Sequence, residues 1–179
     1  MKWNLDIAHS SVDLAVRHMG FATVRGRFKT FDVDVEGDDH GKLSRLEARI
    51  DAASLDTGEP QRDAHLRSDD FLATDHFPEV RFTASRIEPT GASSYRVGGD
   101  LTIRGTSRPV SFDVEVKEPI NDPFGNVRVA AEASGKLNRK DWGLNWNQVL
   151  EAGALLVGEE VRFTIDVQAT AAKEDVVPV

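Results

Sequence analysis

The chain has 179 residues, 40% of them hydrophobic, and is long enough to form one domain with its own core. Its formal net charge of -8 argues against a nucleic-acid partner, because proteins that bind phosphate backbones usually present a basic surface. The sequence contains no Cys, which excludes disulfides, thiolate nucleophiles and zinc sites with Cys ligands.

Alternation of apolar and polar residues begins at the amino terminus. It covers residues 3–7 and resumes over 12–18, so these segments are one long bent strand or two short ones. Residues 31–35 and 46–50 alternate in the same way on either side of a turn at 37–41 that is rich in Gly and Asp. This arrangement predicts a β-hairpin.

Two stretches are predicted to be helical. Residues 59–67 have a Pro near a plausible first turn and few β-branched residues, and the helix continues or restarts over 69–72. A second short helix is predicted near 147–153, because Gly153 suits a helix end. A short helix placed between long strands usually closes the mouth of a barrel.

The second half of the chain holds alternating segments at 80–84, 95–103, 110–116, 127–137 and 161–169. The pair 95–103 and 110–116 is the clearest, because alternation is strict on both sides of a Gly-Thr-Ser-Arg-Pro break. It predicts a hairpin with one apolar face. Counting the two amino-terminal segments as one strand gives about eight strands, which favours an antiparallel all-β barrel or sandwich.

The ends of the chain carry predictions about its domain and location. Residues 1–172 are predicted to form one domain, and 173–179 a tail that frays. The first residues are polar by Asn4 and cannot supply the apolar region of a secretory signal, and no run approaches the roughly 20 apolar residues of a membrane-spanning helix. A cytoplasmic protein without an integral membrane segment is expected.

The sizes of the inward residues decide whether such a barrel is hollow. One face of the segment 127–137 carries mostly small side chains, at Val129, Ala131, Ala133 and Gly135. A solid core needs large residues opposite small ones, and Phe82, Phe112 and Phe163 could supply that bulk. We expect an elongated apolar cavity, with a packed barrel as the alternative. A ligand chain in that cavity would gain about 0.8 kcal/mol per buried CH₂.

No strong catalytic or metal-binding motif is present, because the His-Glu-x-x-His, Gly-x-Ser-x-Gly and Gly-rich nucleotide motifs are all missing. Asp63 and His65 stand two apart on the predicted helix and therefore do not face each other, which indicates a solvated helix face. His18 continues the apolar face of 12–16, and is either a histidine at the barrel rim or a polar anchor for a ligand head group. Trp142 and Trp146, which lie between a predicted strand and a predicted helix, either cap a core or line an entrance.

Short motifs follow one another in order along nearly the whole chain. They lie at residues 7–10, 16–19, 24–28, 50–58, 62–68, 99–105, 108–110 and 138–144. In these motifs the chain resembles the YceI-like family of lipid-binding proteins. The resemblance implies an extended, antiparallel eight-stranded, lipocalin-like barrel with one or two short helices. It also implies a homodimer whose long apolar pore holds a polyisoprenoid, an isoprenoid quinone or a similar amphiphilic lipid.

The expected function is to bind and to sequester or transport this lipid, without catalysis and without a cofactor or metal. By strand parity, the pocket wall is predicted to consist of Leu14, Val16, His18, Phe82, Leu101, Ile103, Phe112, Val114, Ala131, Phe163 and Ile165. Arg25, His65 and Trp142 are candidates for the mouth or for the ligand head group. The alternatives are an enzyme that acts on an isoprenoid lipid and a ligand-free, stress-linked interaction module.

Overall fold

Strands make up most of the protein because apolar and polar side chains alternate along the chain, as expected for sheets with one buried face. The computed structural model describes residues 2–38, 40 and 42–172. Its strands are β1 (Lys2–Leu5), β2 (Ser11–His18), β3 (Ala22–Phe28), β4 (Phe31–Gly37), β5 (Leu43–Asp51), β6 (Leu55–Asp56), β7 (Glu79–Pro89), β8 (Ser94–Ile103), β9 (Thr106–Val116), β10 (Ile120–Asn121), β11 (Val127–Asn138) and β12 (Val157–Ala171). The α-helix is α1 (Pro60–Arg67), and the 3-10 helices are η1 (Ile7–His9), η2 (Ala52–Ser54) and η3 (Arg139–Trp142).

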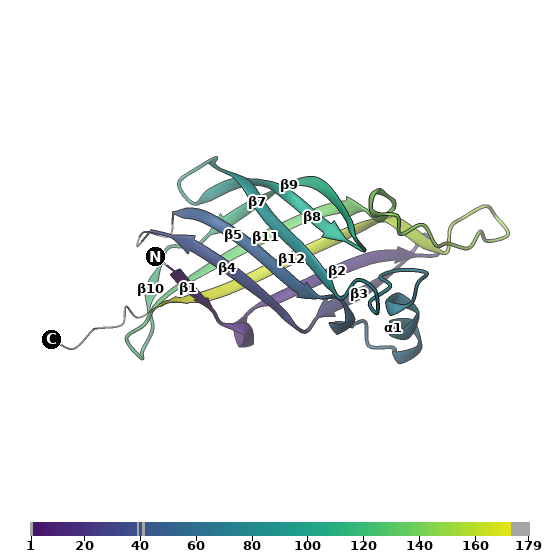
Figure 1. The fold of residues 1–179 in the computed structure, drawn as a ribbon, viewed down its shortest axis with the longest axis horizontal. Helices are drawn as coiled ribbons and strands as arrows, with labels where there is room; N and C mark the ends of the chain where they lie inside the picture. The colour runs from purple at the N-terminus through teal and green to yellow at the C-terminus, as the bar shows by residue number, and fades with distance from the viewer. Residues whose placement is uncertain (1, 39, 41, 173–179) are drawn as a thin grey trace.

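Eight antiparallel strands of the described residues close into a barrel (Figure 1). Around the ring they follow the order β11-β9-β8-β7-β5-β4-β1-β12. Pairing of β12 with β11, from Arg128↔Thr170 to Asn138↔Glu160, completes the ring. Closure removes exposed strand edges and turns the apolar face of the sheet inward. The predicted eight-stranded antiparallel barrel is therefore confirmed.

The amino-terminal segment forms two short strands along one edge of β12. β1 pairs with β12 at Leu5↔Ala169, and β2 pairs with it from Ser11↔Asp166 onward. Ile7 lies in η1 between them and is 50% exposed, so the predicted alternation stops before it. β3, which pairs with β2 along its length, was absent from the sequence prediction. Gly26 at its centre weakens the β-strand signal of that segment.

Both predicted hairpins form. β4 pairs with β5, and β8 pairs with β9. The second hairpin turns at Arg104 and Gly105, whose φ angles of 48° and 72° are those of a two-residue type I′ turn. β9 consequently begins at Thr106, and most of the predicted break at 105–109 belongs to the strand.

The helix predicted over 59–67 is confirmed as α1, which lies at the end of the barrel away from the amino terminus (Figure 1). The Glu59 carboxylate accepts hydrogen bonds from the backbone N–H groups of Gln61 and Arg62, at 3.2 and 2.6 Å, and so caps the first turn. The predicted continuation over 69–72 is wrong, because these residues form turns.

The second predicted helix, near 147–153, is also wrong. Val149 forms a bridge with Leu155, so the chain turns back on itself. Gly153 has a φ angle of 78° and donates its N–H to the Leu150 carbonyl at 2.9 Å. The glycine therefore supplies the left-handed conformation of a tight turn, which gives the same sequence signal as a helix end.

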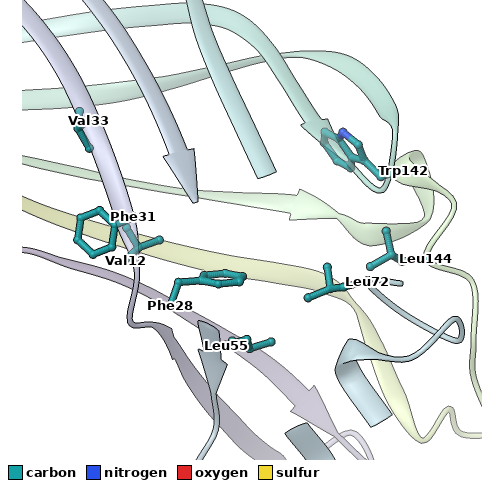
Figure 2. Close-up of a cluster of buried hydrophobic side chains, with 8 residues drawn as sticks. All are labelled: Val12, Phe28, Phe31, Val33, Leu55, Leu72, Trp142 and Leu144. Atoms are coloured by element: carbon teal, nitrogen blue, oxygen red, sulfur yellow. The ribbon is translucent and has the colours of Figure 1, made fainter. Parts of the chain in front are cut away.

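Buried apolar side chains form two clusters inside the barrel. The first contains Val12, Phe28, Phe31, Val33, Leu55, Leu72, Trp142 and Leu144. Figure 2 shows Leu72, Trp142 and Leu144 at one side of this cluster, and Val12, Phe28 and Phe31 at the other. The second contains Phe82, Tyr95, Val97, Val114 and Ala133.

None of the helices formed by the described residues is long and apolar enough to cross a membrane. The predicted tail at 173–179 lies outside the described residues. The predicted domain boundary at residue 172 stays a prediction.

Candidate functional site

A cavity of about 470 Å³ lies inside the barrel. Every strand of the ring contributes lining residues, and most of these are aliphatic or aromatic. Inward side chains such as Leu14, Phe112 and Ile165 are only partly buried, whereas a close-packed interior would cover them. The barrel is therefore hollow.

The residues predicted for the pocket wall border this cavity. They are Leu14, Val16, His18, Phe82, Leu101, Ile103, Phe112, Val114, Ala131, Phe163 and Ile165. Of the predicted mouth residues, His65 and Trp142 border it and Arg25 does not. Arg25 is exposed on β3 beside Val24, which borders the cavity, and alternation along the strand directs its side chain outward. Contact of these side chains with a ligand stays a prediction.

Glycines on two strands make room for aromatic rings. A Cβ atom added at Gly135 would lie 2.7 Å from Cζ of Phe163, and one at Gly99 would lie 2.9 Å from Cε2 of Phe82. The ring centroids of Phe82 and Phe112 are 5.1 Å apart, and those of Phe112 and Phe163 are 5.8 Å apart. The small residues thus accommodate these rings, as a packed barrel would require, yet an open cavity remains beside them.

A buried carboxylate fastens α1 to the segment before it. Asp63 is 7% exposed and accepts hydrogen bonds from Thr57, from the backbone N–H at 3.0 Å and from the hydroxyl at 2.5 Å. Arg62 donates to the hydroxyl and to the backbone carbonyl of Thr57, at 2.7 and 2.8 Å. The prediction of a solvated helix face is therefore wrong for Asp63, because the chain around Thr57 folds over that face.

A cluster of three aromatic side chains at the end of α1, His65, Phe71 and Trp146, borders the same cavity. The His65 ring centroid lies 5.1 Å from that of Phe71 and 4.6 Å from that of Trp146, and both contacts are edge-to-face. His65 Nε2 is 2.7 Å from a carboxylate oxygen of Asp70, which orients the imidazole ring. Across the part of the chain that the structure describes, no three His, Asp or Glu side chains gather as a metal site would require.

Trp142 acts as a cap on the interior. It is 3% exposed, and its indole N–H donates to the Leu101 carbonyl at 2.9 Å. Trp146, which the sequence offered together with Trp142 for a core cap or an entrance, also borders the cavity. Arg139 borders it too and was not singled out from the sequence, because an isolated Arg in the 138–144 motif cannot be told from a surface residue before its distant neighbours are known.

The sequence comparisons agree with this architecture. The model of the YceI-like domain family matches residues 3–169. A UPF0312 protein of Staphylococcus epidermidis is 36% identical over 164 residues, which cover 90% of this chain and 93% of that protein. A UPF0312 protein of Staphylococcus aureus is 37% identical over 164 residues, which cover 90% of this chain and 92% of that protein.

Solved structures share the fold. BcnA of Burkholderia cenocepacia has a TM-score of 0.81 at 24% sequence identity, over 93% of this chain and 100% of that chain. A polyisoprenoid binding domain from Saccharophagus degradans has a TM-score of 0.71 at 15% identity, over 95% of this chain and 98% of that chain. Because the family model spans nearly the whole chain and close relatives cover it to the same extent, the protein belongs to the YceI-like family.

Proposed function

We propose that the protein binds one long apolar or amphiphilic lipid, such as a polyisoprenoid or an isoprenoid quinone, inside its barrel. The observation that carries the proposal is the cavity of about 470 Å³, with aliphatic and aromatic lining residues from every strand of the ring. A buried chain gains about 0.8 kcal/mol per CH₂, so tight binding needs few polar contacts. The polyisoprenoid-binding domain of Saccharophagus degradans, which shares the fold, supports this ligand class.

Binding by burial leaves the lipid chemically unchanged, which suits sequestration or transport. The proposal includes a homodimer. Light scattering would measure the mass of the particle directly and so test it. Purified protein would be examined by native mass spectrometry and then extracted with organic solvent. We expect one lipid per chain, recovered unaltered after incubation. An altered lipid would favour an enzyme. Protein that carries no lipid and takes up no added polyprenol would overturn the proposal.

Two adjacent positions on β12 provide a matched pair of variants. Ile165 borders the cavity, whereas Thr164 is exposed on the outer face. Ile165→Trp fills part of the ligand space, and we expect it to weaken polyprenol binding by about tenfold or more, where tenfold corresponds to about 1.4 kcal/mol. Thr164→Trp adds the same ring outside the barrel and should leave the affinity unchanged. Equal effects of the two variants would contradict binding inside the barrel.

A further inference from the structure

Two neighbouring loops at the end of the barrel where α1 lies are almost free of charge. Residues 18–24, between the end of β2 and the middle of β3, contain no Asp, Glu, Lys or Arg, although 29% of the whole chain is charged. Residues 142–158, from the end of η3 to the start of β12, contain Glu151 as their one charged residue. The second loop projects beyond the barrel (Figure 1). Met19 donates its backbone N–H to the Leu156 carbonyl at 2.9 Å, so the two loops lie side by side.

These two loops carry exposed apolar side chains. Phe21 is 76% exposed and Val149 is 69% exposed, and Met19 and Leu155 are exposed beside them. Single apolar residues on a surface are ordinary, whereas a group of them marks an interaction surface. We call Met19, Phe21, Val149 and Leu155 the apolar loop patch.

The fold holds the apolar loop patch in place. Asn147 Nδ2 donates to the Val157 carbonyl at 2.7 Å, and its Oδ1 accepts the Val157 N–H at 3.1 Å, which fastens the base of the projecting loop. Met19 has a φ angle of 55°, a conformation that favours Gly or Asn. A large apolar side chain at this exposed turn is therefore explained neither by burial nor by backbone preference.

Two arginines beside the patch have no carboxylate partner among the described residues. Arg17 donates from Nη1 to the Phe21 carbonyl at 3.1 Å, and Arg25 is exposed on β3. By contrast, Arg27 on the same strand pairs with Asp13 at 2.7 Å. The protein thus presents uncompensated positive charge next to the patch, although its formal net charge is -8.

We propose that the apolar loop patch docks this end of the barrel on an anionic lipid bilayer. Phe21 and Val149 insert among the lipid chains, while Arg17 and Arg25 face the anionic head groups. Apolar side chains next to cations are the combination that binds the surface of an anionic membrane. The projecting shape of the longer loop suits insertion into a bilayer (Figure 1).

The apolar loop patch adjoins the cavity without lining it. Leu156, next to Leu155, borders the cavity, and so does Arg17, which is also exposed. The lining of the cavity therefore reaches the protein surface beside the patch. A bilayer docked here would be the donor or acceptor of the lipid in the proposed function, but docking itself rests on the patch and its charges.

Co-flotation of the full-length, lipid-free protein with vesicles tests the docking. We expect binding to vesicles of phosphatidylcholine and phosphatidylglycerol in equal parts. Phe21→Ser should weaken this binding by about tenfold or more, as the burial of a Phe side chain implies. Phe124→Ser is the matched control, because Phe124 is 85% exposed in the turn between β10 and β11, at the opposite end of the barrel (Figure 1). Wild-type protein that does not bind, or equal losses in the two variants, would overturn the proposal.

The charge contribution is tested separately. One cation close to an anionic membrane strengthens binding by about fivefold, so Arg25→Gln should weaken binding to the anionic vesicles by that factor. Arg96→Gln is the control, because Arg96 is exposed on β8 and pairs with Asp113 at 2.9 Å. Glu151→Gln removes a negative charge from the loop and should strengthen the binding. Equal affinity of the wild-type protein for vesicles of phosphatidylcholine alone would overturn the assignment to an anionic bilayer.

A second copy of the chain is the other candidate occupant of the patch. Light scattering without vesicles should give the same mass for Phe21→Ser as for the wild-type protein. A lower mass for the variant would assign the patch to an interface between copies and overturn the docking proposal. Circular dichroism checks that the variant folds. Its uptake of polyprenol without vesicles should be unchanged, because Phe21 lies outside the cavity lining, so loss of docking and loss of lipid binding are distinguishable.

Discussion

Enlarging one small residue of β11 tests directly whether the barrel interior is hollow. Ala131 borders the cavity and is only partly buried. Ala131→Leu adds three carbon atoms, and at about 0.8 kcal/mol for each buried CH₂ the greatest possible gain is about 2.4 kcal/mol. Because the new side chain stays partly exposed to the cavity, we expect the free energy of unfolding of the lipid-free protein to rise by about 1 kcal/mol. Urea denaturation of lipid-free protein would measure it.

Ala133, two residues further along the same face, is the matched control. Ala133 also borders the cavity, but it is 9% exposed and packs in the cluster that contains Tyr95, Val97 and Val114. Ala133→Leu should therefore overpack this region and lower the free energy of unfolding by about 1 to 3 kcal/mol. A loss of that size for Ala131→Leu as well would mean that the space beside Ala131 is filled, and would refute the hollow interior at that position.

Three further changes test individual contacts. Gly99→Ala places a Cβ atom 2.2 Å from a backbone carbonyl oxygen of β7, and should lower the free energy of unfolding by about 1 to 3 kcal/mol in urea denaturation; unchanged stability would contradict this packing. Asp63→Ala leaves the N–H and hydroxyl of Thr57 without their acceptor and should lower the free energy of unfolding by about 1 to 3 kcal/mol. Circular dichroism would follow the helical signal of α1. An equally stable variant would mean that the carboxylate does not anchor the helix. Hydrogen bonds, first from the backbone N–H of Asn126, lower the pKa of Asp122 from 3.8 to about 2. The wild-type advantage over Asp122→Asn should therefore be complete above the unfolded-state pKa and disappear as the pH falls to about 2; a difference in unfolding free energy that persists there would contradict the assignment.

Local patterns were sufficient to predict most of the strands and the inward face of each. Leu101, Ile103, Phe112 and Val114 were assigned to the wall from alternation alone, and all four border the cavity. The prediction succeeds because alternate side chains of an extended backbone point to opposite faces, whatever the strand pairs with. The start of α1 was equally predictable, because Pro at the first turn fits the helical φ angle.

Turns of the chain were less well predicted, because the same short sequence pattern is compatible with several local structures. Gly153 suits the end of a helix and equally the tight turn that it forms between Val149 and Leu155. Asp63 looked solvated on its helix, and is buried because Thr57 lies over it. In both cases the outcome depends on where the flanking segments lie, which a short window of sequence does not contain.

Only the closed fold brings together the residues near α1 that border the cavity, such as Arg62, His65 and Arg139. Arg139 reaches the carbonyls of Val157 and Gly158 because η3 lies beside the start of β12, and Phe71 reaches Trp146 from a different part of the chain. Alternation predicted the apolar wall, since it depends on neighbouring backbone alone. The assembly of Arg62, His65 and Arg139 depends on barrel closure and strand register, which join residues that are distant in sequence.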